Sequence, residues 1–186
     1  APMGLSARRA LRRQRAPNEP CRAPNALVRR FIAGADGAMS VAFSPDGRHL
    51  AAGCADGQLF PIRIISVESG GERAALTGHG SIVYDLAWST DSRTLLSASA
   101  DGTVRAWRVP RDGGARPYLA ALIRHAPAMY VYAARFHPKA PELVVTGGFD
   151  RSVRLWDLGG DFTRDAARRD RASASVARGG GGGGGG

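Results

Sequence analysis

The sequence contains only two cysteines, Cys21 and Cys54, and it has no long apolar run. Two cysteines at this separation offer neither a disulfide framework nor the close spacing of a metal site, so we expect a reducing intracellular compartment and no bound metal or cofactor. A membrane-spanning helix needs about 20 consecutive apolar residues, and no apolar stretch approaches that length. We therefore expect a cytoplasmic protein without a transmembrane segment.

Positive charge is abundant, but the middle of the chain has little of it. The net charge is +10, of which residues 1–30 carry +7 and residues 159–186 carry +2. Because a nucleic-acid-binding surface needs basic residues on one face of a domain, the nearly neutral middle argues against a nucleic-acid partner. We expect residues 1–17 to be a basic disordered flank, with an organelle transit sequence as the alternative. We expect residues 159–186, which end in a run of glycines, to be a disordered tail.

Residues 18–158 contain a β-meander that occurs three times. In its clearest copy, residues 81–109, apolar and polar side chains alternate with the period of a strand, and Asp101-Gly102 marks a tight turn before a third strand. A period in the forties is typical of a repeat fold with four short strands per unit. The turn aspartates of the three copies lie 45 and 49 residues apart, at Asp56, Asp101 and Asp150.

The pattern predicts an all-β fold of three four-stranded antiparallel repeats, at residues 27–65, 73–109 and 118–158. Pro61 cannot donate a hydrogen bond to a neighbouring strand, so an exposed position or a bulge is expected there. The outermost strands have no neighbour, and unpaired edges are templates for association, so we expect the chain to aggregate or to pair with a second copy. The predicted strands cover residues 27–33, 39–43, 50–54, 59–65, 73–76, 83–88, 94–99, 103–109, 118–123, 128–136, 142–146 and 152–158.

These features resemble the WD40 repeat of β-propellers, in which a Gly-His pair precedes the meander and a Trp closes its third strand. The resemblance implies that a hydrogen-bonded tetrad of imidazole, hydroxyl, carboxylate and indole holds each blade together. Each of these groups would cost about 1–3 kcal/mol if it were buried unpaired. In the second repeat, which begins with Gly78-His79, the tetrad residues are His79, Ser99, Asp101 and Trp107.

The other two repeats match this tetrad in part. The third offers His125, Asp150 and Trp156, but Gly148 stands where the hydroxyl is expected, and the first keeps only Asp56. We therefore expect the second blade to be the best specified. The same residue types could form a Ser-His-Asp hydrolase triad, but the sequence supplies no nucleophile elbow and no oxyanion donor pair. A non-enzymatic protein is predicted.

The resemblance also points to a partner-binding surface. In WD40 propellers the residue before the turn aspartate lies near the top of the ring, which here implies Ala100 and Phe149, with Met129 and Tyr130 in a neighbouring loop. These four are our candidate partner-binding residues. The alternative is that Phe149 packs between blades, since aromatic residues are more often core than contact residues.

Three stretches carry a closer resemblance: residues 19–25, GHGSIVYDLAWS at 78–89 and RFHPKAPELVVTGGFDRSVRLW at 135–156. Over residues 19–158 the chain resembles the propeller region of the jouberin family of ciliary scaffold proteins. This implies a non-enzymatic scaffold in a multiprotein complex, which acts in assembly of the ciliary transition zone and in ciliogenesis. The family has about seven repeats, preceded by a coiled coil and usually followed by an SH3 domain. This chain shows none of these flanks, so we expect it to be a fragment of a larger ring.

Two other functions fit a propeller of this kind. One is an adaptor of a ubiquitin ligase or of another intracellular complex, although Leu158-Gly159 follows the Trp-Asp pair of the third repeat where such adaptors carry an arginine. The other is an RNA-associated propeller recruited through the N-terminal arginines, although these lack the interleaved aromatic residues that would stack on bases.

Overall fold

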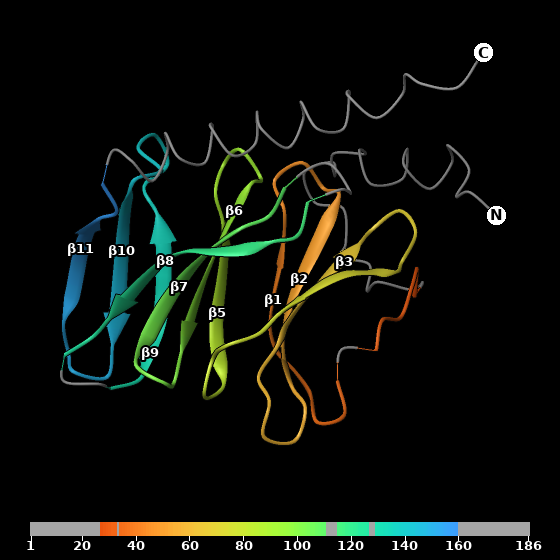
Figure 1. The fold of residues 1–186 in the computed structure, drawn as a ribbon, viewed down its shortest axis with the longest axis horizontal. Coiled ribbons are helices and arrows are strands. Elements are labelled where there is room, and N and C mark those ends of the chain that lie inside the picture. The colour runs from red at the N-terminus through yellow and green to blue at the C-terminus, as the bar shows by residue number, and fades with distance from the viewer. Residues whose placement is uncertain (1–26, 33, 111–114, 127–128, 160–186) are drawn as a thin grey trace, which may run out of the picture. The chain divides into compact units, whose positions relative to one another are not determined.

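A computed structural model of the chain describes residues 27–32, 34–110, 115–126 and 129–159. The secondary structure of these residues consists of strands in three antiparallel sheets, so the predicted all-β fold is confirmed (Figure 1). The first sheet holds β1 to β4, the second β5 to β8 and the third β9 to β11, and consecutive strands are neighbours within each sheet. The strands are β1 (Gly37–Phe43), β2 (His49–Ala55), β3 (Ile62–Ser66), β4 (Glu72–Leu76), β5 (Val83–Trp88), β6 (Thr94–Ser99), β7 (Thr103–Arg108), β8 (Tyr118–Arg124), β9 (Val131–Phe136), β10 (Leu143–Gly148) and β11 (Val153–Asp157).

The predicted strand at residues 27–33 is not formed over its described part. Residues 27–32 have no strand structure, and Leu27, Val28 and Ile32 are exposed. An extended segment is stable only when a neighbouring strand pairs with its backbone, and the described residues provide no such neighbour. The first repeat therefore lacks its leading strand, and the third sheet has three strands. The basic flank, residues 1–17, and all but the first residue of the tail, residues 159–186, lie outside the described residues.

Pro61 differs from expectation as well. It is buried and lies one residue before β3, and its carbonyl oxygen accepts a hydrogen bond from the backbone of Cys54 at 2.9 Å. A proline at the entry to a strand needs no donor of its own, so neither exposure nor a bulge is required. The third run of the first repeat accordingly starts at Ile62 instead of residue 59.

Two hydrophobic clusters join the three sheets, and β6 separates them. All six residues of β6 are buried. Successive side chains of a strand point to opposite faces, so Leu95 belongs to the cluster shared with the first sheet and Leu96 to the cluster shared with the third. Each fully buried Leu, Ile or Val contributes about 1.5–3 kcal/mol. The second sheet is thus the centre of the packed structure.

Hydrogen bonds between the first strands of the sheets fix how the sheets are placed. The Ser40 hydroxyl donates to the Val83 carbonyl at 2.9 Å, and the Trp88 indole donates to the Ala42 carbonyl at 3.2 Å. These pairs advance in the same direction along both strands, so β1 and β5 run parallel. Asp85 of β5 makes the next link, because its carboxylate accepts the backbone N–H of Ala134 in β9 at 3.0 Å.

Candidate functional site

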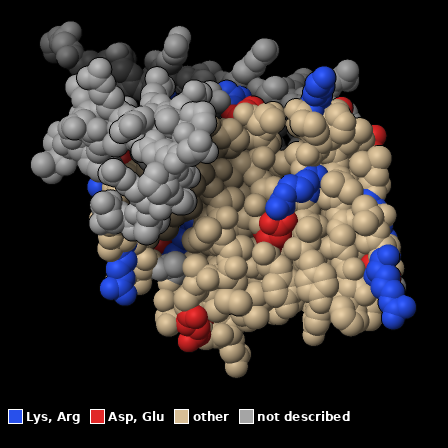
Figure 2. Space-filling view, turned by 180° about the vertical axis from the view of Figure 1, so that it is seen from behind, with Lys and Arg blue, Asp and Glu red and all other residues tan. Residues whose placement is uncertain are grey.

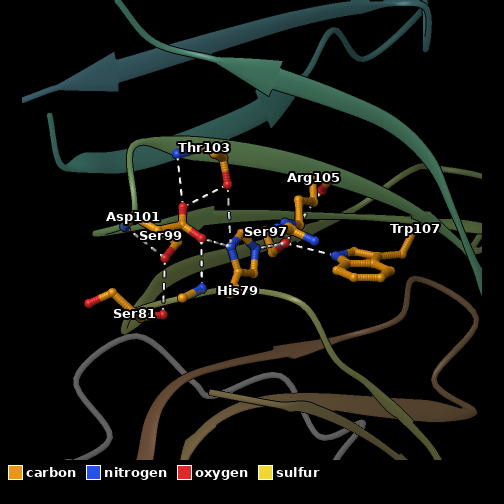
Figure 3. Close-up of polar contacts among 9 residues, drawn as sticks. His79, Ser81, Ser97, Ser99, Asp101, Thr103, Arg105 and Trp107 are labelled. Carbon is orange, nitrogen blue, oxygen red and sulfur yellow. Dashed lines mark hydrogen bonds and ion pairs between the residues drawn. The ribbon is translucent and has the colours of Figure 1, made fainter. Parts of the chain in front are cut away.

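A buried polar array ties the loop before β5 to β6 and β7 (Figure 3). His79 Nδ1 lies 2.8 Å from an Asp101 carboxylate oxygen, and His79 Nε2 lies 2.7 Å from the Ser97 hydroxyl. The Trp107 indole donates to the same hydroxyl at 2.8 Å. Thr103 donates to Asp101 through its hydroxyl at 2.6 Å and its backbone at 2.9 Å. The array therefore closes the tight turn between β6 and β7 and anchors the preceding loop to it.

The charge of Asp101 is stabilised within this array. Burial by itself raises the pKa of a carboxyl group, but the hydrogen bonds from His79, Thr103 and Gly80 outweigh burial and hold the pKa of Asp101 well below its usual range. Asp101 is consequently an acceptor at neutral pH. Its partners are N–H and O–H donors, as a carboxylate requires.

The hydroxyl of this array comes from Ser97 and not from Ser99, which corrects the prediction. Ser99 instead donates to the Ser81 carbonyl at 3.0 Å and accepts the Asp101 backbone N–H at 3.1 Å. The two serines are two residues apart in one strand, so they lie on the same face of the sheet. Sequence spacing alone could not decide which of them meets the imidazole.

The third sheet has a complete set of the same groups, because Thr146 supplies the hydroxyl. His125 Nε2 and the Trp156 indole each lie 2.8 Å from the Thr146 hydroxyl. Gly148, at the position where we expected the hydroxyl, is two residues further along β10, which is the same offset that separates Ser99 from Ser97. The prediction that the third blade lacks a hydroxyl is therefore wrong.

Arg154 changes how the carboxylate joins the array of the third sheet. His125 Nδ1 lies 3.9 Å from the Asp150 carboxylate, while Arg154 reaches both groups, at 2.7 Å from His125 Nδ1 and 2.6 Å from Asp150. Burial and the charge of Arg154 lower the pKa of His125, and Asp150 opposes them in part. Hydrogen bonds from the Ser152 hydroxyl and backbone lower the pKa of Asp150.

The first sheet has no such array. Asp56 pairs with Arg63 at 3.3 Å, and Ile62 occupies the position that corresponds to Trp107 by the 45-residue repeat. Ile62 is fully buried in the cluster between the first and second sheets. Apolar packing replaces the polar array in this blade.

The order Asp101–His79–Ser97 is that of a hydrolase triad, but its surroundings are those of a structural element. Ser97 is fully buried, and its oxygen already accepts the Trp107 indole. A nucleophile must reach a substrate and needs donors for the developing oxyanion. A fully buried hydroxyl that already accepts the Trp107 indole does not meet the first condition, so we interpret the array as one that holds the turn. Within the described residues there is no group of three or more His, Cys, Asp or Glu residues that could hold a metal, and no helix long and apolar enough to cross a membrane.

Exposed aromatic rings gather where β5 and β9 meet. We call Tyr84, Tyr130, Tyr132 and Phe149 the aromatic cluster. Tyr84 and Tyr132 have ring centroids 5.4 Å apart, and Phe149 lies 6.1 Å from Tyr130 and 6.4 Å from Tyr132. All four residues keep more than a third of their surface exposed, with Phe149 at 56%. Such a concentration of exposed aromatic surface is characteristic of interaction sites.

The structure places our candidate surface residues as follows. Phe149 and Tyr130 belong to the aromatic cluster, Met129 is exposed beside Tyr130, and Ala100 is half-buried at the end of β6. Phe149 contacts the two tyrosines and is absent from both hydrophobic clusters between the sheets. Sequence reasoning missed Tyr84 and Tyr132, although each directly follows a buried valine at the start of its strand.

Comparison with known proteins places this geometry in a family. The profile described as WD domain, G-beta repeat matches residues 26–60, 70–108 and 118–157, one match for each of the three repeats. The chain belongs to the WD40-repeat family. Its joined sheets are blades of a β-propeller, and the polar arrays are the tetrads of the second and third blades.

Individual relatives extend this comparison. Jouberin of Rattus norvegicus is 40% identical over 155 residues and jouberin of Mus musculus 39%, in each case over 83% of this chain and 14% of the relative. Coronin-7 of Bos taurus is 38% identical over 84 residues, 43% of this chain and 9% of that protein. The chain therefore spans about one seventh of the length of the jouberins it matches.

Solved structures agree on the fold. The β-propeller domain of Myceliophteria thermophila Cps50 (Swd1) superposes with a TM-score of 0.59 at 27% identity, over 70% of this chain and 38% of that chain. A chain of the mitotic checkpoint complex gives a TM-score of 0.53 at 24% identity, over 63% of this chain and 32% of that chain, which supports the fold alone.

Proposed function

We propose that this chain is a non-enzymatic protein-interaction scaffold that acts with other proteins at the base of the cilium, in assembly of the transition zone and in ciliogenesis. The observation that carries the ciliary part is the 40% identity to jouberin over 155 residues.

The arrangement of polar and apolar groups supports a binding role. His79 and His125 are engaged with the carboxylate and hydroxyl groups of their tetrads. The aromatic cluster, in contrast, remains open to solvent. A fold that encloses its reactive groups and exposes aromatic surface is suited to binding other proteins.

The two alternative functions receive less support. On the part of the described surface that Figure 2 leaves visible, the Lys and Arg side chains do not join into the continuous basic area that an RNA backbone would need. The arginines of residues 1–17 lie outside the described residues. The ubiquitin-ligase adaptor is also a protein-interaction scaffold, so the nature of the captured proteins separates it from the ciliary function.

The test is proximity labelling in ciliated cells that express the whole chain fused to a biotin ligase. We expect labelled proteins, and the fusion itself, to be enriched at the cilium base relative to the ligase alone, with the pattern unchanged by nuclease. A Trp107→Ala variant, which breaks the tetrad, controls for dependence on the folded propeller. Uniform cytoplasmic labelling identical to that of the ligase alone would contradict the ciliary function, and loss of the signal on nuclease treatment would favour RNA.

A further inference from the structure

The turn between β10 and β11 holds its exposed residues in a fixed geometry. The Phe149 backbone N–H donates to the Tyr130 carbonyl at 2.8 Å. Asp150 accepts the Ser152 backbone at 3.0 Å and its hydroxyl at 2.7 Å, and Arg154 connects Asp150 to the tetrad of the third blade. These contacts hold the turn in place, and Phe149 and the residue after Asp150 are exposed on it.

That second residue is Arg151, which has a backbone φ of +65°. The corresponding turns of the first two blades have glycine, with φ of +64° at Gly57 and +79° at Gly102. A side chain in the left-handed region is strained, which is why glycine is the usual residue there. The third blade alone among the described turns of this type keeps a long cationic side chain at the position.

Among the described residues, the other non-glycine residue with a positive φ makes a hydrogen bond that compensates the strain. Ser92, with φ of +60°, accepts the backbone N–H of Asp46 from the neighbouring blade at 3.0 Å. Its side chain thus joins two blades. Arg151 is exposed and has no ion-pair or hydrogen-bond partner for its guanidinium among the described residues. Backbone strain at a residue whose side chain makes no stabilising contact is typical of functional positions.

The rings of the aromatic cluster contact one another instead of enclosing a space. Their centroids lie between 5.4 and 6.5 Å apart, with interplanar angles of 53° to 73°, which is the range of tilted and edge-to-face ring pairs. An ammonium-binding cage needs ring faces arranged around an open centre. This cluster is better described as a continuous apolar surface, with a free guanidinium two residues along the chain from Phe149.

We propose that the aromatic cluster and Arg151 form a docking site for a peptide segment of a partner protein in which an acidic residue stands beside aromatic or large aliphatic residues. The apolar side chains of the peptide cover the rings, and its carboxylate pairs with the guanidinium, which suits bidentate carboxylate binding. This inference rests on the proposed protein-interaction function and specifies one surface and one chemistry for it.

The test measures binding of labelled peptides to the whole chain by fluorescence anisotropy. The probe is a short peptide with two glutamates flanking a Phe-Leu pair, and the two comparison peptides replace the glutamates by lysine or the Phe-Leu pair by alanine. We expect saturable binding of the acidic probe, weakened by salt, and at least tenfold weaker binding of both comparison peptides. Equal or tighter binding of the lysine peptide would overturn the proposal in favour of a cationic ligand, and absence of binding by the acidic probe would also overturn it.

Two variants locate the binding. Arg151→Gly installs the residue that the other blades use at this position, so the fold is retained, and we expect about tenfold weaker binding of the acidic probe. Arg48→Ala, which removes an exposed arginine from the turn between β1 and β2, should leave binding unchanged. Phe149→Ala should weaken binding to a similar extent as Arg151→Gly.

Peptide binding and cellular labelling by the Arg151→Gly variant test the docking site and the proposed function separately. If Arg151→Gly binds the probe as well as wild type does, the docking site is refuted. Cellular labelling by the same variant then reports on the scaffold function by itself: unchanged enrichment at the cilium base would leave that function standing on another surface. Reduced labelling together with reduced peptide affinity would support both.

Discussion

His79 and His125 occupy equivalent positions in adjacent blades, but Nδ1 of His79 faces a carboxylate and Nδ1 of His125 faces a guanidinium. The distances are 2.8 Å to Asp101 and 2.7 Å to Arg154. A carboxylate only accepts hydrogen bonds and a guanidinium only donates them. His79 therefore donates from Nδ1, whereas neutral His125 accepts at Nδ1 and donates from Nε2 to Thr146. The two tetrads share a shape, but Nδ1 has opposite hydrogen-bonding roles in them.

From the environment of His125 we predict that acidification destabilises the folded protein in part through the third blade. Burial and the charge of Arg154 lower the pKa of His125 in the folded protein below its ordinary value of 6.5, so the unfolded chain takes up the proton first. The stability contributed by neutral His125 is complete above about pH 6.5 and is lost as the pH falls toward the folded pKa. Burial and Arg73 shift the pKa of His49 in the same direction, with Asp46 opposing them.

Urea unfolding between about pH 7.5 and pH 5 measures this effect. We expect the free energy of unfolding to decrease with falling pH, and His125→Gln to flatten the decrease because the titrating group is gone. A double variant that also carries His49→Gln should be flatter still. Asp101, whose pKa is lowered, adds a further loss only below about pH 4. A slope unaffected by either substitution would rule out these histidines as its source.

Thr146→Val tests the residue that sequence reasoning overlooked. Valine has nearly the same shape but cannot accept a hydrogen bond, so the His125 and Trp156 donors would both be left unpaired. We expect a loss of about 1–3 kcal/mol in the free energy of unfolding. Val145→Thr, at the adjacent exposed position of β10, is the matched control and should change stability by less than about 0.5 kcal/mol. Equal effects of the two changes would mean that the Thr146 hydroxyl has no special role.

The two tryptophans should differ in their contribution to stability. Trp107 is 4% exposed and packs between the first and second sheets, whereas Trp156 is half-buried on β11, at the edge of the third sheet. Trp107→Ala should cost about 3–5 kcal/mol and Trp156→Ala clearly less. The cause is burial, since both blades have a complete tetrad. Denaturant unfolding followed by circular dichroism would reveal the difference, and a larger loss for Trp156→Ala would contradict it.

The sequence predicts features that depend on neighbouring residues better than features that depend on contacts between residues far apart in the chain. Turns such as Asp101-Gly102 follow from local chemistry, and the repeat period predicted the order of the sheets. The choice between Ser97 and Ser99 depends on where the imidazole meets the strand, which a two-residue strand period does not encode. Only two members of the aromatic cluster were predicted, because Tyr84 of β5 meets Tyr132 of β9 only through the packing of two blades.

Arg151→Gly should stabilise the protein, whereas Ser92→Gly should not. Both residues have a positive φ, and relief of that strain is worth about 1 kcal/mol. Ser92 would also lose its 3.0 Å hydrogen bond to Asp46, which offsets the gain. We expect a higher melting temperature for Arg151→Gly and little change or a decrease for Ser92→Gly, measured by calorimetry. Destabilisation by Arg151→Gly would indicate that the guanidinium contributes to the fold.

The outer faces of the first and third blades lead to the final prediction, that the chain self-associates in solution. Val153 and Leu155 of β11 are 78% and 69% exposed, and Val41 and Phe43 of β1 are 65% and 66% exposed. Apolar strand surfaces of this kind normally pack against another blade, and unpaired edge strands are templates for association. We expect the apparent mass in light scattering to rise with concentration. Replacing Val153 and Leu155 by lysine should suppress the rise, because the charges cannot be buried unpaired, whereas Leu122→Lys, on β8 of the central sheet, should not. A monodisperse monomer at all concentrations, with protected amides in β11 by hydrogen exchange, would show that these faces are stable in water without a partner.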